Sequence, residues 1–141
     1  MLRGADSVRL VHQWGTGYDK IPVDLAKEMG VPVARSPGVN APTNPDLTIG
    51  MMIAALRRIP LHYNNTRAGK WIEPEIVPGA RDLSSQKVGL IGFGAIGQLV
   101  AKRLTGFDCE VLYYRRSGEA EGTSARYAER DEILETCDIV S

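Results

Sequence analysis

The sequence predicts an α/β fold with a doubly wound parallel sheet, and three neighbouring segments carry this prediction. Residues 87–91 form an apolar, β-branched run that suits a buried parallel strand. A glycine-rich turn follows, and residues 98–104 then show the periodicity of a helix. A second apolar run, 109–114, begins after Gly106. This order of strand, glycine turn, helix and strand is typical of the first half of a Rossmann-like sheet.

The glycine-rich turn has the spacing of a dinucleotide-binding loop, G-x-G-x-x-G, and each glycine has a separate expected role. Gly92 permits a tight turn, and Gly94 lets the backbone approach a pyrophosphate without a Cβ atom. Gly97 lets the helix pack closely against the strand. The backbone N–H groups of Ala95 and Ile96 then face the phosphates, where the helix dipole favours negative charge. We therefore expect these five residues to bind a dinucleotide.

The end of the second strand bears on which dinucleotide is bound. NAD sites place an acid about 20 residues beyond the glycines to bind the ribose hydroxyls. This chain instead has Arg115, Arg116 and Ser117, with no acid before Glu119. Two guanidinium groups and a hydroxyl can hold a 2′-phosphate through charge-assisted hydrogen bonds. The sequence thus favours NADP over NAD, which stays possible. The alternative is a solvated loop whose arginines touch nothing.

Composition restricts the class of protein further. The chain has 141 residues, a formal net charge of zero and 43% hydrophobic residues, which is typical of a soluble domain with one core. The balanced charge argues against nucleic acid or an anionic membrane as partner. No apolar stretch approaches the roughly 18–20 residues of a membrane-spanning helix, and residues 1–6 lack the apolar core of a signal peptide.

The two cysteines indicate a compartment. Cys109 and Cys137 show neither a C-x-x-C motif nor the spacing of metal ligands. We expect both to be buried free thiols of a cytoplasmic protein, and we expect no metal site.

The region before the glycine loop suggests a small α/β unit and then a long helix. Strands are expected at 8–11 and 31–34, with a helix from Pro22 to Met29 between them. The breaker cluster 36–42 is the expected domain junction. The helix expected over 44–66 has a bend or restart at Pro60, and 67–80 form an extended arm. The side chains expected to face inward from this helix are Leu47, Met51, Ala54, Ala55 and Leu56.

The region after the second strand returns to the sheet. A third strand is expected near 125–127, a helix over 130–136 and a fourth strand from 138 to the last residue, Ser141. The chain therefore stops inside the fourth strand of the expected sheet.

The order of short motifs along the chain resembles the D-isomer-specific 2-hydroxyacid dehydrogenase family, which includes phosphoglycerate dehydrogenase and glyoxylate/hydroxypyruvate reductase. The resemblance runs from about Val8 to Ser141 and includes landmarks independent of the dinucleotide glycines. The matching segments are Gly15-Thr16-Gly17-Tyr18-Asp19, Ser36-Pro37-Gly38-Val39-Asn40, Arg57-Arg58-Ile59-Pro60, Gly69-Lys70-Trp71, residues 89–97 and Cys137-Asp138-Ile139-Val140.

This resemblance implies a division into two domains. Residues 1–40 would be the C-terminal part of a flavodoxin-like substrate domain. Residues 41–141 would be the N-terminal part of an NAD(P)-binding domain with strand order 3-2-1-4, including a hinge helix and arm at 41–80. The implied reaction is hydride transfer between the nicotinamide and a D-2-hydroxy or 2-keto acid.

The resemblance also locates the catalytic groups. The family's catalytic Arg, Glu and His follow the fourth strand, so we expect no catalytic residue in this chain and an incomplete activity of the chain alone. His12 and His62 are isolated histidines in other positions. Asn40 matches an asparagine near the substrate cleft. Its alternative role is a turn residue that hydrogen-bonds its own backbone.

Two other functions and one assembly state stay open at this point. A corepressor-like sensor of the same fold would bind the dinucleotide without catalysis, and an unrelated Rossmann enzyme would share only the glycine loop. Trp71 and the arm at 67–80 resemble the family's dimer-crossing segment, and a sheet ending at its fourth strand would expose an edge. We therefore expect a homodimer or other self-association.

Overall fold

The computed structural model describes residues 4, 7–71 and 77–141. Most of the N-terminal stretch considered for a signal peptide, and the middle of the arm, therefore lie outside the described residues. The chain divides into two compact units, residues 1–42 and residues 43–141.

The first unit is a parallel strand pair joined by a helix. Its elements are β1 (Val11–Gln13), α1 (Val23–Glu28) and β2 (Val33–Arg35). Both strands begin later than the sequence predicts. Pro32 has no N–H, so pairing begins with its carbonyl oxygen, which accepts from the Val11 N–H at 3.0 Å. The Val31 N–H is already used, because it donates to the Ala26 oxygen at 2.8 Å and closes the end of α1.

The second unit is a four-stranded sheet in which every neighbouring pair is parallel. The strands are β3 (Lys87–Ile91), β4 (Glu110–Tyr114), β5 (Arg126–Tyr127) and β6 (Ile139–Val140). Their order across the sheet is β5-β4-β3-β6, which reads 3-2-1-4 when the strands are numbered from Lys87.

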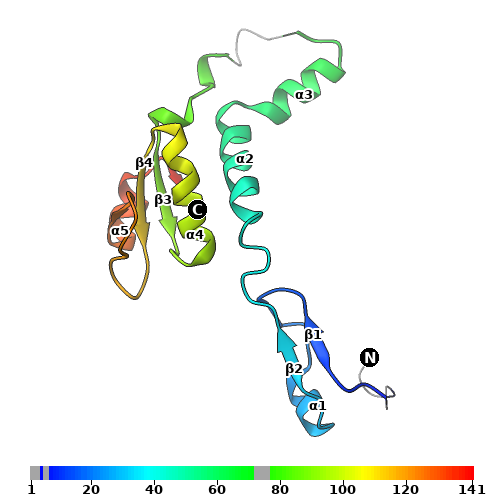
Figure 1. Ribbon diagram of the computed structural model, residues 1–141. Helices are drawn as coiled ribbons and strands as arrows, with labels where there is room; N and C mark the ends of the chain where they lie inside the picture. The colour runs from blue at the N-terminus through cyan, green and yellow to red at the C-terminus, as the bar shows by residue number, and fades with distance from the viewer. Residues whose placement is uncertain (1–3, 5–6, 72–76) are drawn as a thin grey trace. The chain divides into compact units, whose positions relative to one another are not determined.

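Helices cover both faces of this sheet, so the architecture is the predicted doubly wound α/β type (Figure 1). On one face, α4 (Ala95–Leu104) packs on β3 and β4, and α2 (Asn44–Leu56) packs on α4. On the other face lies α5 (Arg130–Thr136), which contacts both central strands. The larger core, on the α4 face, includes Val88, Leu90, Val100, Leu104 and Tyr113. The smaller core consists of Leu112, Ala128 and Ile133.

The predicted long helix is interrupted where the sequence indicates. Helix α2 ends at Leu56, and α3 (Ile59–Arg67) begins after Arg58, whose φ of 51° is left-handed. Pro60 lies in the first turn of α3, where its missing N–H needs no helical partner. The expected restart at this proline is confirmed. Three short 3₁₀ turns complete the unit, at Val77–Gly79, Leu83–Ser85 and Thr105–Phe107.

The predicted inward face of α2 is wrong for most of its members. Leu47 and Met51 are 65% and 64% exposed, whereas Ile49 and Met52 are buried against α4. Leu56 alone of the predicted set packs on the core. The helix is apolar around most of its circumference, so its periodicity does not show which side meets α4.

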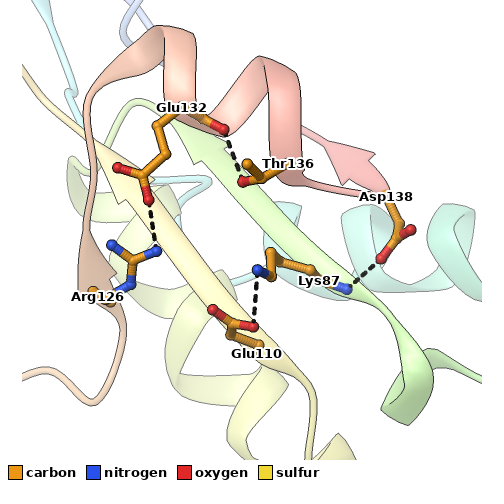
Figure 2. A network of polar contacts seen from close by, with 6 residues as sticks. All are labelled: Lys87, Glu110, Arg126, Glu132, Thr136 and Asp138. Atoms are coloured by element: carbon orange, nitrogen blue, oxygen red, sulfur yellow. Dashed lines mark hydrogen bonds and ion pairs between the residues drawn. The ribbon is translucent and has the colours of Figure 1, made fainter.

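Charged side chains join the strands at the amino end of the sheet, where β3 and β4 begin (Figure 2). The Lys87 ammonium lies 3.3 Å from the Glu110 carboxylate on the neighbouring strand. The Asp138 carboxylate accepts the Lys87 backbone N–H at 2.8 Å, which fixes the start of β6 beside β3. Arg126 at the start of β5 pairs with Glu132 of α5 at 2.7 Å. Exposed pairs of this kind each contribute about 0–1 kcal/mol, so they set register more than stability.

Gly89, in the middle of β3, makes the close packing of α5 possible. A Cβ atom on Gly89 would lie 2.3 Å from Ile133 Cγ2 and 3.0 Å from Cys137 Sγ. Both distances are shorter than packed atoms allow, so α5 can approach the sheet only because this strand residue has no side chain.

We expect Gly89→Ala to lower the free energy of unfolding by about 1–3 kcal/mol, because the added methyl overpacks the α5 face. Urea unfolding of the whole chain measures this change. Gly50→Ala in α2 is the control, since its Cβ would meet no atom within 4 Å and alanine favours a helix by about 0.5–1 kcal/mol. Equal stability of Gly89→Ala and the unmodified chain would contradict this packing argument.

Candidate functional site

The glycine loop connects the end of β3 to the start of α4 with the expected tight turn. Gly92 has a φ of +115°, a conformation that side chains with a Cβ rarely adopt. Its N–H donates to the Tyr114 oxygen at 2.9 Å, so the loop starts level with the end of β4. Gly94 is extended, and α4 begins at the next residue.

The first turn of α4 lies directly against this loop. A Cβ atom on Gly97 would be 2.2 Å from the Gly92 carbonyl oxygen, a backbone atom that has no rotamer to move it away. The Gln98 side chain adds a second tie, because its Nε2 donates to the Phe93 oxygen at 3.1 Å. The glycine at position 97 is thus required by the close approach of helix and loop, as its spacing predicts.

The start of α4 suits a phosphate group. Within the described part of the chain, no side chain caps this helix end, so its first N–H groups are left for water or a ligand. Ala95 and Ile96 are both exposed there. A Cβ on Gly94 would meet no protein atom within 4 Å, so the space beside it is open. An open backbone surface with unpaired N–H groups and a positive helix end fits a pyrophosphate.

An aromatic pair joins the glycine loop to the segment after β4. The buried Phe93 ring stacks on Tyr113 with centroids 3.7 Å apart. The Tyr113 hydroxyl in turn accepts the Ala120 N–H at 2.6 Å. The segment between β4 and β5 is therefore held by the same side chains that pack beneath the glycine loop. Neither aromatic residue stands out in the sequence, because the contact joins residues 20 positions apart.

The three residues predicted to select the cofactor lie in one tight turn after β4. The Gly118 N–H donates to the Arg115 oxygen at 3.2 Å, which places Arg116 and Ser117 at the two central positions. Arg115 Nε also donates to the Gly118 oxygen at 2.6 Å, and its Nη2 donates to the Glu119 oxygen. Arg116 and Ser117 are exposed. The alternative in which neither arginine touches anything is therefore wrong for Arg115.

Asn40 lies in the first unit, whereas the glycine loop and the Arg115 turn lie in the second. The asparagine is exposed in a turn closed by the Ala41 N–H, which donates to the Gly38 oxygen at 2.9 Å. The same unit ties its two loops together, since the Gly38 N–H donates to Thr16 Oγ1 at 3.3 Å. Thr16 also accepts Arg35 Nη1 at its backbone oxygen, at 3.2 Å.

The histidines are not brought together with these groups. His12, on β1, lies 2.9 Å from Ser36 Oγ, and His62 is half-buried on α3 in the other unit. Over residues 4, 7–71 and 77–141, no group of three or more His, Cys, Asp or Glu residues could hold a metal. Burial raises the pKa of both half-buried thiols, Cys109 and Cys137, above the ordinary value, which keeps them protonated at neutral pH.

One further contact fixes α4 against α2. Asp46, in the first turn of α2, pairs with Arg103 Nε of α4 at 2.7 Å. Nothing in the sequence indicates that this acid at a helix start has a partner on α4. The acid thus joins α2 to α4 as well as favouring the helix start.

Comparison with known proteins identifies the family of the chain. The family profile described as D-isomer specific 2-hydroxyacid dehydrogenase, NAD binding domain, matches residues 49–141. A glyoxylate reductase of Thermococcus litoralis is 30% identical, and a hydroxypyruvate reductase of Thermotoga maritima is 32% identical; each alignment covers the whole chain and 45% of the relative. The chain thus spans less than half the length of these relatives.

Solved structures give the same fold. A D-lactate dehydrogenase from Aquifex aeolicus, complexed with NAD and lactic acid, has a TM-score of 0.78 and 26% identity over 94% of this chain and 40% of its own. An NAD-dependent formate dehydrogenase from Staphylococcus aureus in complex with NAD has a TM-score of 0.86 at 24% identity, over 99% of this chain and 42% of its own. With a family profile matched over more than half of its length, the chain belongs to the D-isomer-specific 2-hydroxyacid dehydrogenase family.

Proposed function

We propose that this chain supplies the dinucleotide-binding part of an oxidoreductase that interconverts D-2-hydroxy acids and 2-keto acids. The observation that carries the proposal is the uncapped start of α4, beside which the space at Gly94 is open. The nicotinamide, when bound, accepts or donates the hydride. The relatives named glyoxylate reductase and hydroxypyruvate reductase support this substrate class.

The residues of this chain would bind and orient the cofactor. The N–H groups of Ala95 and Ile96 would bind the pyrophosphate at the positive end of the helix. Gly94 would allow its close approach, while Gly92 and Gly97 hold the loop and helix in place. Asn40 would contact the substrate acid. The catalytic Arg, Glu and His are not assigned to any residue of this chain.

We further propose that the cofactor is NADP in preference to NAD. The turn after β4 has no carboxylate at the position where an NAD site accepts hydrogen bonds from the ribose hydroxyls. It presents Arg116 and Ser117 to solvent. A guanidinium and a hydroxyl at this place favour a 2′-phosphate, which a carboxylate would repel.

We propose the domain assignment and the cellular setting on the resemblance to the same family. Residues 1–40 would belong to the substrate domain and residues 41–141 to the dinucleotide-binding domain, in a cytoplasmic protein. The free thiols Cys109 and Cys137 support a reducing compartment. In the described part of the chain no helix is long and apolar enough to cross a membrane. A corepressor-like sensor would use the same cofactor site, but the relatives named as reductases favour the enzyme.

We propose that the chain forms a homodimer, because α2 and α3 expose apolar side chains. Leu47 and Met51 are 65% and 64% exposed, and Trp71 beyond α3 is 80% exposed. Monomeric proteins rarely leave such apolar groups together in solvent. A hollow on this surface is lined by Met51, Ala54, Ala55, Arg58, Pro60 and Leu61.

The cofactor preference is testable by titration. We expect NADPH to bind the chain at least about tenfold more tightly than NADH, because charge-assisted hydrogen bonds to one phosphate contribute about 1.5–3 kcal/mol. Quenching of the Trp14 and Trp71 fluorescence, or the signal of the reduced nicotinamide, reports binding. Equal affinities, or tighter NADH binding, would show that the turn after β4 does not select a phosphate.

Substitutions at two glycines of the loop should affect stability and cofactor binding differently. Gly94→Ala should unfold within about 0.5 kcal/mol of the unmodified chain, yet lose at least about tenfold affinity for both reduced dinucleotides. Gly97→Ala should lose binding and also about 1–3 kcal/mol of stability, because its methyl meets a backbone oxygen. Urea unfolding and fluorescence titration measure the two effects. Undiminished cofactor binding by Gly94→Ala would place the pyrophosphate elsewhere.

Self-association should depend on the exposed side of α2. We expect light scattering to show dimers at high protein concentration, and Met51→Glu to shift them to monomers by placing a charge in the apolar surface. Leu134→Glu on α5 is the control, because Leu134 is 56% exposed on a different helix. A monodisperse monomer of the unmodified chain at high concentration would contradict the proposal.

A further inference from the structure

The turn after β4 uses its two arginines for different purposes. The guanidinium of Arg115 is half-buried and donates back into its own turn, to the carbonyl oxygens of Gly118 and Glu119. Arg116 is exposed, and among the described residues its side chain has no recorded hydrogen bond or ion pair. Equal exposure would be expected if both side chains served one ligand in the same way.

The contacts of Arg115 close the turn from two directions. Its backbone oxygen accepts the Gly118 N–H at 3.2 Å, and its Nε donates to the Gly118 oxygen at 2.6 Å. Gly118 has a φ of +77°, so the chain reverses there in a conformation that favours glycine. A guanidinium has a planar set of donors that can serve two neighbouring carbonyl oxygens at once, which the single ammonium of lysine does less well.

The segment beyond this turn is anchored independently. The Ala120 N–H donates to the Tyr113 hydroxyl at 2.6 Å, and Tyr113 stacks on Phe93 of the glycine loop. The turn is therefore held at both ends, by the end of β4 and by Ala120. With both points held, Arg116 and Ser117 are presented at the exposed corner on the side where the glycine loop also starts, because Gly92 donates to Tyr114 at the end of β4.

We infer that Arg116, with Ser117, is the specificity-determining contact for the 2′-phosphate, and that Arg115 is a positioning residue that holds the turn in shape. This assignment rests on the proposed NADP preference and deepens it. The guanidinium of Arg116 has five N–H bonds, and the four on Nη1 and Nη2 are enough for a bidentate contact with phosphate. Arg115 acts through the Gly118 and Glu119 carbonyls and contacts no phosphate.

The test compares substitutions at both arginines in the whole chain, with NADPH and NADH as probes. We expect Arg116→Ala to weaken NADPH binding about tenfold and to change NADH binding less than about twofold, so that the preference disappears. Arg115→Ala and Arg115→Lys should both reduce the preference about three- to fivefold, because neither side chain holds both carbonyls. Arg81→Ala removes one exposed positive charge before β3 and should leave the preference unchanged.

Hydrogen exchange of the turn amides provides the second readout. The Gly118 amide should exchange faster in Arg115→Ala and Arg115→Lys than in the unmodified chain, and at the unmodified rate in Arg116→Ala. The Ala120 amide, which donates to the Tyr113 hydroxyl, should keep its rate in all three variants. The assignment is overturned if Arg115→Lys keeps the full preference while Arg115→Ala loses it with unchanged exchange, since Arg115 would then be a charge that contacts the phosphate. It is also overturned if Arg116→Ala retains the preference.

Different results would overturn the NADP preference and the division of roles between the two arginines. An unmodified chain that does not prefer NADPH removes the cofactor proposal and the phosphate role of Arg116 together. If the unmodified chain prefers NADPH but Arg115→Ala shows the effects expected of Arg116→Ala and the reverse, the cofactor proposal stays in place. Only the division of roles between the two arginines is then overturned.

Discussion

The close approach of Gly97 to the Gly92 carbonyl is the contact on which the rest of the second unit depends. With a Cβ at position 97 only 2.2 Å from that oxygen, any other residue would push α4 away from the end of β3. The approach places the start of α4 at the carboxyl end of the sheet and its body over Val88, Leu90 and Tyr113. Helix α2 then packs on α4 and pairs with it through Asp46 and Arg103. One backbone contact thus determines both where α4 begins and how α4 and α2 are layered on the sheet.

A second set of contacts links the two parts of the proposed cofactor site. Phe93 follows the first glycine of the loop, and its ring packs on Tyr113, whose hydroxyl holds Ala120. The loop expected to bind pyrophosphate and the turn expected to bind ribose phosphate are therefore anchored on the same aromatic pair. This matters because the segment between β4 and β5 has no helix of its own to fix it. Tyr113 of β4 and Phe93 of the glycine loop take over the positioning that a crossover helix provides in other parallel sheets.

The features that the sequence predicts correctly are those set by local backbone geometry. The positive φ of Gly92, the restart of the helix at Pro60 and the order of elements all follow from residue type and spacing. The features it misses depend on distant partners. Gly89 is explained only by Ile133, and the buried side of α2 only by the position of α4. The contacts of the Arg115 guanidinium with the Gly118 and Glu119 carbonyl oxygens are also missed, because nothing in the sequence shows which carbonyls face it.

The pairing of charges, rather than their number, gives the two ends of the sheet different character. Lys87 at the amino end, and Arg126 beside the middle of β4, each face a carboxylate, so their charges are largely balanced. At the other end Arg115 donates to neutral carbonyls, and among the described residues neither Arg115 nor Arg116 forms an ion pair. The positive charge of this corner is therefore not neutralised, although the whole chain has a net charge of zero. Together with the positive end of α4, it favours an anionic group at the carboxyl edge of the sheet.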